Sequence, residues 1–388
     1  MPALEAHHIP EWSNAALPHA LESLRTLVGI ESVSENVIGV QEVQAALQRE
    51  LEALGLLCER RTLTDRGDVV IATTAAGRDT RARIVLCGHA DIALGFSEGY
   101  HSLTVDGERA RGPGAYDMKA GLIVITYACR ALKEMGMLDR LPLEIVFNSA
   151  EESSTQESRD LMRQVAAEAR AALVFEFGRD NDALVTERSC LAEFILTVTG
   201  RSAHMGNEYA KGANAAFGLA ERLLAMERMI DLPNGAICNA GLISVEAEPS
   251  RVADRARATV QCRAFTNEDL ERIEAGLKQL RSADARGCTA ELARTKLFSP
   301  LEETPASREL YEQYKAACKR AGFEAGRAPR QGGVSDANHL GSKTPTIDAL
   351  GPKGGGAHTK DEFVIIPSIL QRVEALIYFL ISQPEARQ

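Results

Sequence analysis

The sequence predicts an α/β fold, in which a mostly parallel sheet flanked by helices carries an inserted ferredoxin-like α+β domain. Strand-like and helix-like segments alternate from about residue 15 to 190, and the segments after them follow the order βαββαβ. Short apolar runs that alternate with helices are typical of buried, mostly parallel strands. The order βαββαβ is that of a ferredoxin-like unit.

The first domain is expected to start with helices and continue as alternating strands and helices. Helical patterns cover residues 16–28, 40–54, 119–135 and 158–170. Short β-rich apolar runs predict strands at 68–73, 82–87, 143–148 and 172–177.

The middle of the chain changes character. Residues 194–199 alternate apolar and polar side chains, as expected of a strand with one solvent-exposed face. A helix (213–229), two strands (237–247 and 257–265), a helix (267–281) and a strand (289–295) follow. We therefore expect residues 191–302 to form a compact domain inserted into a larger one made of residues 1–190 and 303–388. The larger domain resumes with a helix at 306–321 and ends with 367–381.

Composition narrows the class of protein. A length of 388 residues suits two domains, and a net charge of −10 argues against nucleic acid or an anionic membrane as the main partner. The eight cysteines are dispersed without a CxxC pair, which favours a reducing compartment. The N-terminus lacks the pattern of a signal peptide, and the longest apolar run, 122–128, is too short to span a bilayer. We expect a soluble, cytoplasmic protein.

Metal-binding side chains follow the predicted strands. His89 comes after ARIVLCG, Glu151 after LEIVFNSA, and Glu176 closes ALVF. In open α/β sheets, ligands gather at the carboxyl ends of the strands. Asp117, in a glycine-rich turn, and His358, after three glycines, offer further ligands. Imidazoles and carboxylates bind a divalent metal, or a pair that shares a carboxylate, so convergence of these residues would indicate a hydrolase.

Each piece also has a simpler interpretation. His89 and Asp91 could lie in a surface loop, although the spacing also lets the aspartate accept the spare imidazole N–H. Asp117 could be a helix N-cap rather than a carboxylate that bridges two metals. Glu151 and Glu152 could lie in a solvated loop, or one could bind metal while the other acts as a general base.

The remaining two candidates are equally open. Glu176 lies inside an apolar run, where an unpaired carboxylate is costly unless a metal or a strong cation compensates it. The glycines before His358 allow the backbone to pass close to a ligand, or simply make a flexible loop.

Taken together, the motifs HAD, GPGAYDMKAG, AEES, FEFG, GRSAHMG and AHTKDE make the chain recognisable. Their ordered set resembles the zinc metallopeptidase family of acetylornithine deacetylase, succinyl-diaminopimelate desuccinylase and glutamate carboxypeptidase. The resemblance covers about residues 20–385, including the inserted domain. Through VFNSAEES, SRDLM and CRAFTNEDL it looks most similar to the glutamate carboxypeptidase branch.

The resemblance implies a site with two zinc ions, for which cobalt or manganese could substitute. His89 and Glu176 would hold one ion, Glu152 and His358 would hold the other, and Asp117 would bridge them. Asp91 would orient His89. Glu151 would take a proton from the attacking water and return it to the leaving amine. Family members often have a cis peptide at the position of Asp117–Met118.

The inserted domain would supply the partner subunit and part of the substrate site. By the resemblance, His204 reaches the active site of the second subunit and stabilises the oxyanion, which implies a homodimer through residues 191–302. Arg263 matches a family arginine and could clamp a substrate carboxylate. From the residues alone, His204 could be a turn histidine and Arg263 an exposed strand residue.

A glycine-rich segment resembles the family loop that lines the substrate pocket; it contains Gly332, Gly333, Ser335 and Asp336. Two departures from the family pattern concern substrate. Ser250 stands where relatives usually have an asparagine that often contacts substrate, followed by Arg251, which could recognise an extra carboxylate or be solvated. Gln261 stands where an aspartate is common.

The leading hypothesis is hydrolysis of an amide bond in a small anionic substrate by a glutamate-carboxypeptidase-like enzyme. The alternative is an N-acyl-amino-acid deacylase of the acetylornithine deacetylase or succinyl-diaminopimelate desuccinylase type. A third hypothesis is a non-catalytic member that binds a ligand or partner. That hypothesis predicts missing metal ligands, and the complete set argues against it.

Overall fold

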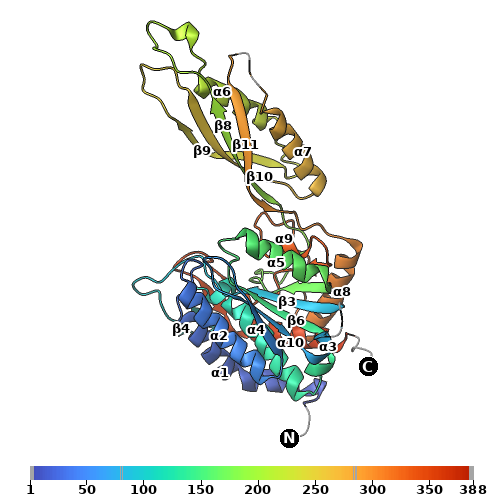
Figure 1. The fold of residues 1–388 in the computed structure, drawn as a ribbon. Helices are drawn as coiled ribbons and strands as arrows, with labels where there is room; N and C mark the ends of the chain where they lie inside the picture. The colour runs from blue at the N-terminus through green and yellow to red at the C-terminus, as the bar shows by residue number, and fades with distance from the viewer. Residues whose placement is uncertain (1–3, 79, 81, 283, 285, 384–388) are drawn as a thin grey trace. The chain divides into compact units, whose positions relative to one another are not determined.

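The structure, a computed structural model, describes residues 4–78, 80, 82–282, 284 and 286–383 (Figure 1). The chain divides into two compact units. Unit 1 comprises Met1–Thr186, Glu303–Pro329 and Ser335–Gln388, and unit 2 comprises Glu187–Glu302 and Arg330–Val334. Residues 330–334, which the sequence placed in the larger domain, thus pack with unit 2.

A six-stranded sheet forms the centre of unit 1, with the order β1-β2-β6-β3-β7-β12. Its strands are β1 (Leu57–Arg61), β2 (Val69–Thr73), β6 (Leu143–Asn148), β3 (Arg83–His89), β7 (Ala169–Val174) and β12 (Thr346–Ile347). β6, β3, β7 and β12 run parallel, whereas β1 and β2 are antiparallel additions at one edge. The mostly parallel sheet is therefore confirmed. The sequence missed β1 because it is polar and largely exposed.

Helices cover both faces of this sheet (Figure 1). α1, α2, α4 and α10 lie on one face and α5 and α9 on the other, with α8 packed against α10. Their bounds are α1 (Ile9–Val28), α2 (Val37–Ala53), α3 (Ala75–Arg78), α4 (Ala120–Glu134), α5 (Gln156–Ala167), α8 (Pro305–Arg320), α9 (Ala337–Leu340) and α10 (Ile366–Ile381). α1 begins earlier than predicted, with a proline in its first turn.

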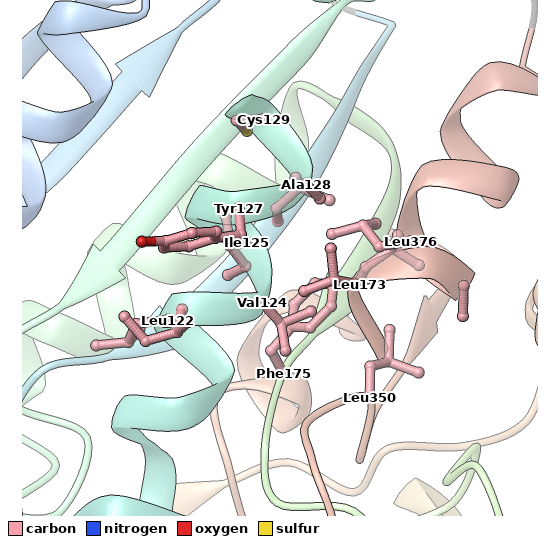
Figure 2. Packing of buried hydrophobic residues seen from close by; sticks show 14 of the residues in the cluster. Leu122, Val124, Ile125, Tyr127, Ala128, Cys129, Leu173, Phe175, Leu350 and Leu376 are labelled. Atoms are coloured by element: carbon pink, nitrogen blue, oxygen red, sulfur yellow. The ribbon is translucent and has the colours of Figure 1, made fainter. Parts of the chain in front are cut away.

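The core of unit 1 lies between α4, α10 and the sheet. Figure 2 shows side chains of α4, such as Val124, gathered with Leu173 of β7, with Phe175 just after that strand and with Leu376 of α10. These side chains are fully buried, which is why α4 and α10 are apolar almost all round. Among the described residues, no helix is both long and apolar enough to cross a membrane.

A small antiparallel sheet in unit 1 carries a loop of the candidate site. Its order is β13-β14-β5-β4, with β4 (Thr104–Asp106), β5 (Arg109–Arg111), β13 (Gly354–Gly355) and β14 (Phe363–Ile365). The sequence did not predict it, because strands of two or three residues show no periodicity.

Unit 2 is a four-stranded antiparallel sheet with two helices. The chain order is β8 (Leu191–Thr199), α6 (Ala215–Glu227), β9 (Ile237–Val245), β10 (Arg255–Arg263), α7 (Asn267–Gln279) and β11 (Thr289–Phe298). The sheet order β11-β8-β10-β9 places the first and third strands side by side at the centre. This βαββαβ arrangement confirms the ferredoxin-like prediction. The buried side of β8 alternates strictly, as the sequence indicated.

Candidate metal centre

His89 is the last residue of β3, at the carboxyl end of a buried parallel strand. Its side chain is 1% exposed. Nε2 lies 3.3 Å from Asp117 Oδ1 and 3.5 Å from Glu176 Oε1. Nδ1 lies 2.9 Å from the backbone oxygen of Asp91 and 3.4 Å from the Asp91 carboxylate. The carbonyl and the carboxylate of Asp91 thus both lie beside Nδ1, and orientation of His89 by Asp91 stays a prediction.

Asp117 lies between the glycine-rich turn and α4. Lys119, not Asp117, is the N-cap of α4, which excludes the N-cap interpretation. The two carboxylate oxygens face different histidines: Oδ1 lies 3.3 Å from His89 Nε2, and Oδ2 lies 3.1 Å from His358 Nε2. The peptide bond Asp117–Met118 is cis, as the resemblance implied. A carboxylate with an imidazole at each oxygen is placed to bridge two metal ions.

Glu151 and Glu152 lie in the turn that follows β6. The Asp91 carboxylate fixes this turn, because Oδ1 accepts from the Glu151 N–H at 3.1 Å and Oδ2 from the Glu152 N–H at 3.0 Å. Ser34 donates to the same Oδ2 at 2.6 Å. Asp91 therefore positions the glutamate pair, a role that the sequence did not predict. The Glu152 side chain is 14% exposed, which disagrees with a solvated loop.

Glu176 lies two residues beyond the end of β7, whereas the sequence placed it inside a strand. The strand ends early because the backbone after Val174 forms a hydrogen bond with the segment that follows β12. There the Gly351 N–H donates to the Glu176 carbonyl at 2.8 Å. An added Cβ at Gly351 would lie 2.6 Å from the Phe175 carbonyl oxygen, so only glycine fits this close approach. The Glu176 carboxylate is buried beside His89.

His358 lies in the loop between β13 and β14 and has a φ of 62°. Nε2 is 3.1 Å from Asp117 Oδ2 and 3.4 Å from Glu152 Oε1. Its side chain is 58% exposed, so this edge of the site is open.

The donor atoms of the site suit a metal. Two overlapping sets, His89–Asp117–Glu152 and His89–Glu151–Glu176, each place their donor atoms within 4.8 Å of one another. Glu152 Oε1 is buried and accepts no hydrogen bond from the described residues. A buried carboxylate oxygen in that state is costly unless a cation compensates it, and imidazole with carboxylate is a zinc ligand set.

The pKa values reflect this crowding of acids. Burial, with Glu176 and Glu152 adding to it, raises the pKa of Glu151 well above its usual range. Burial also acts to raise the pKa of Asp117, but hydrogen bonds from His358 and His89 outweigh it and lower that pKa to about 2. Asp117 is therefore held ionised between the two rings.

Glu362 is a buried residue of the site that no motif of the sequence indicated. Its carboxylate accepts hydrogen bonds from the backbone N–H groups of Gly114, Tyr116 and Asp117 and from the Tyr100 hydroxyl. The motif AHTKDEF does not predict this role, because a Lys-Asp-Glu run usually indicates a solvent-exposed segment.

Other predicted site residues lie in unit 2. His204 is exposed and pairs with Arg251 in an isolated bridge, and the Met205 N–H donates to the Ser250 carbonyl at 2.9 Å. His204 Nδ1 accepts from the backbone N–H groups of Gly206 and Asn207 at 3.2 Å each. A turn thus holds the imidazole by Nδ1, while Ser250 and Arg251 lie beside it.

Arg263 lies at the end of β10, where it contacts the loop 330–334. Its Nη1 donates to the Gly332 carbonyl at 3.1 Å, and Ser189 donates to the same oxygen at 2.8 Å. The Gly333 carbonyl accepts from Arg188 Nη1 at 3.1 Å. An added Cβ at Gly332 would meet no heavy atom of the described residues within 4 Å. Neither packing nor a positive φ therefore explains this glycine.

Ser335 and Asp336 lie in unit 1, and their side chains are engaged in hydrogen bonds. The Ser335 hydroxyl donates to Asp348 Oδ2 at 2.7 Å and accepts from the Ala337 N–H at 3.1 Å. The Asp336 carboxylate accepts from Asn148 Nδ2 at 2.9 and 2.8 Å. Contact of Ser335 with substrate stays a prediction.

Gln261 has a local explanation. On adjacent strands its Nε2 donates to Glu193 Oε2 at 2.9 Å. The aspartate common at this position would place a second negative charge opposite Glu193, which is unfavourable across strands.

Comparisons with known proteins identify the family of the chain. The model of peptidase family M20/M25/M40 matches residues 85–382. The sequence is 28% identical over 375 residues to carboxypeptidase G2 of Pseudomonas sp. (strain RS-16), covering 92% of this chain and 87% of that protein.

Solved structures share the fold. The aminopeptidase PepT from Bacillus cereus ATCC 10987 has a TM-score of 0.79 at 20% identity, covering 94% of this chain and 98% of that one. The M20 family metallo-carboxypeptidase Sso-CP2 from Sulfolobus solfataricus has a TM-score of 0.71 at 16% identity, covering 93% and 98%.

Fold and site define a metal-dependent hydrolase of peptide or amide bonds. The chain belongs to peptidase family M20/M25/M40.

Proposed function

We propose that this chain is a dizinc hydrolase that cleaves the amide bond of a small anionic substrate and releases a C-terminal glutamate-like residue. The observation that carries the proposal is the placement of Asp117 between His89 and His358, one at each carboxylate oxygen. His89 and Glu176 would hold one ion, and Glu152 and His358 the other. Bound zinc would supply a Lewis acid that polarises the scissile carbonyl and activates water.

Glu151 is the proposed general base. It lies in the turn after the buried strand β6, where its backbone N–H donates to the Asp91 carboxylate. Its raised pKa reflects burial among other carboxylates, and this environment favours acceptance of a proton. The Glu151 carboxylate takes the proton from the attacking water and delivers it to the nitrogen of the leaving amine.

The substrate carboxylate is proposed to bind near Arg263 and the loop 330–334. Arg263 has a second guanidinium nitrogen besides the one bonded to Gly332, and the space at Gly332 lets a ligand approach the backbone. A guanidinium beside open backbone is suited to a carboxylate. Carboxypeptidase G2, by its name, removes C-terminal residues, which favours this substrate class over an N-acyl amino acid.

A panel of zinc-loaded assays tests the substrate class. Folyl-glutamates, dipeptides and N-acyl amino acids would be compared by kcat/KM. The proposal expects the highest value for substrates with a C-terminal glutamate. A preference for N-acyl amino acids would favour the deacylase, and no metal-dependent turnover of any amide would contradict both.

We further propose a homodimer that forms through unit 2. His204 with Ser250 lies beyond the end of β8, whereas Arg263 lies at the opposite end of the adjacent antiparallel strand. A nine-residue strand spans about 26 Å, too far for one small substrate to contact both groups in one chain. A second subunit would supply His204 to the site.

The exposed apolar residues of unit 2 support that association. β9 is an edge strand, and Leu242, Ile243 and Val245 on it are 71%, 57% and 46% exposed. Phe217 and Leu224 on one side of α6 are also more than half exposed. Leu242→Lys should convert the dimer to a monomer in sedimentation experiments, and Leu57→Lys on the edge strand β1 of unit 1 is the matched control. A wild-type monomer would contradict the dimer.

The compartment is proposed to be the cytoplasm. All eight cysteines lie in the described part of the chain as free thiols, seven of them buried. Free thiols persist in a reducing environment.

A further inference from the structure

We propose that Glu362 positions the bridging carboxylate of Asp117. Binding of the second metal, the ion assigned to Glu152 and His358, would depend on it. The inference rests on the metal site proposed above. It concerns a side chain that binds no metal itself and acts through the backbone of Asp117.

The Glu362 carboxylate is saturated with donors. Oε1 accepts from the N–H groups of Tyr116 and Asp117, each at 2.9 Å, and Oε2 accepts from the Gly114 N–H at 3.1 Å and the Tyr100 hydroxyl at 2.9 Å. The residue is 3% exposed. Three of the four donors belong to the segment 114–117, so one carboxylate defines the path of the backbone into Asp117.

Glu362 and His358 belong to the same short loop between β13 and β14. The loop is compact, because the Thr359 N–H donates to the Gly356 carbonyl at 3.0 Å and the Glu362 N–H to the Thr359 carbonyl at 3.3 Å. His358 Nε2 lies 3.1 Å from Asp117 Oδ2. This loop therefore contacts Asp117 in two places. Glu362 bonds the backbone N–H of Asp117, and His358 lies beside the Asp117 carboxylate.

That arrangement links two ligands that are 241 residues apart in the chain. The carboxylate of Asp117 can face both imidazoles only if its backbone keeps a fixed distance from the β13–β14 loop. Glu362 provides that constraint, since it ends the loop and bonds the Asp117 N–H. Backbone pairing of Val364 with Ala110 and the bond from the Gly112 N–H to the Glu362 carbonyl hold the two segments together from the other side.

Glu362→Gln tests the proposal with little change in volume. The glutamine amide keeps one acceptor oxygen. Its NH₂ group takes the place of the other oxygen and cannot accept, so the two N–H or O–H groups that bonded that oxygen lose their partner. Replacing groups that orient ligands typically costs about 10- to 100-fold in metal affinity. We expect a loss of that size for the second of two zinc ions, measured by competition with a chromophoric chelator, and a lower kcat with KM changed less than about twofold.

Two further variants separate positioning from simple folding. Glu144→Gln alters a carboxylate that is similarly buried, at 5% exposure, at the opposite end of β6, and should leave zinc affinity unchanged. Tyr100→Phe removes one of the four donors and should weaken the second zinc by about 2- to 10-fold. The Tyr100 variant decides the question if Glu362→Gln does not fold.

The outcomes are distinct. Two zinc ions in the wild type with weakened binding of the second in Glu362→Gln would support the inference. Wild-type-like affinity for both ions in Glu362→Gln, or in Tyr100→Phe where only that variant folds, would overturn it while leaving the proposed function intact. A wild-type chain that binds no zinc would contradict the proposed function, and this inference with it.

Discussion

The Arg222–Asp284 pair of unit 2 and the acidic cluster at the strand ends of unit 1 hold their charged side chains in opposite ways. In unit 2, the buried Arg222 and the partly buried Asp284 form an ion pair at 2.9 Å, and each partner makes further hydrogen bonds with backbone groups. In unit 1, acidic side chains converge at the strand ends around His89 and His358, and Glu152 Oε1 accepts no hydrogen bond from the described residues. A buried charge is therefore no sign of a site by itself. Convergence of several acidic side chains around two imidazoles, with one buried carboxylate oxygen that accepts no hydrogen bond from the described residues, is the informative feature.

The largest effect expected from this contrast is on catalysis. Glu151→Gln keeps the shape of the turn but removes the base, so kcat should fall by about 10²- to 10⁴-fold. Zinc content and KM should change little, because Glu151 is not a proposed ligand. Steady-state kinetics with metal analysis on the same sample measures this. Full activity in this variant would remove Glu151 from the mechanism.

Removal of metal should affect only one of the two units. At zinc concentrations about 1,000 times Kd, binding stabilises the folded state by about 4 kcal/mol. A chelator should therefore lower hydrogen-exchange protection in unit 1, around β3 and residues 114–117, and leave β10 of unit 2 unchanged. Equal loss of protection in both units would contradict the claim that the metal stabilises unit 1 alone.

Arg263 tests whether unit 2 contributes to substrate binding. Arg263→Ala should raise KM by about 10- to 100-fold if a charged hydrogen bond of about 1.5–3 kcal/mol is lost. Arg263→Lys should recover only part, because lysine lacks the fork geometry. Substrates without the C-terminal carboxylate serve as the control. Their kcat/KM should be the same with the wild-type enzyme and with Arg263→Ala.

The smallest effect is expected at the Arg222–Asp284 ion pair, whose hydrogen bonds are provided within unit 2. Asp284→Asn should cost about 1–3 kcal/mol of stability and leave kcat and zinc binding unchanged. Burial raises the pKa of Asp284, but hydrogen bonds from Cys288, Arg222 and Arg286 outweigh it and lower that pKa. The pair thus stabilises the fold above the unfolded pKa of about 3.9, and this contribution is lost as pH falls through the lower folded pKa. Urea unfolding at neutral and acidic pH checks the sign.

Much of the architecture could be predicted from the sequence. The strands β3 and β6 are buried and mostly apolar, and the topology of a parallel sheet places His89, at the end of β3, and Glu151, in the turn after β6. The ferredoxin-like unit was predictable because its central strands β8 and β10 alternate and α7 has a clear amphipathic spacing.

The remaining features depend on contacts between distant segments. β13 and β14 are too short to show a pattern, so the loop that holds His358 could not be derived from periodicity. Asp91 was predicted only to orient His89, and no motif indicated that its carboxylate also accepts hydrogen bonds from the backbone of Glu151 and Glu152. Glu362 acts on a segment 245 residues away, a relation that no local pattern encodes.

The central claim is a pair of metal ions that share Asp117. A crystal grown with zinc and measured at the zinc absorption edge tests it most directly. We expect two anomalous peaks flanking the Asp117 carboxylate, one beside His89 and Glu176 and the other beside Glu152 and His358. Peaks elsewhere, or a single peak that does not touch Asp117, would contradict it.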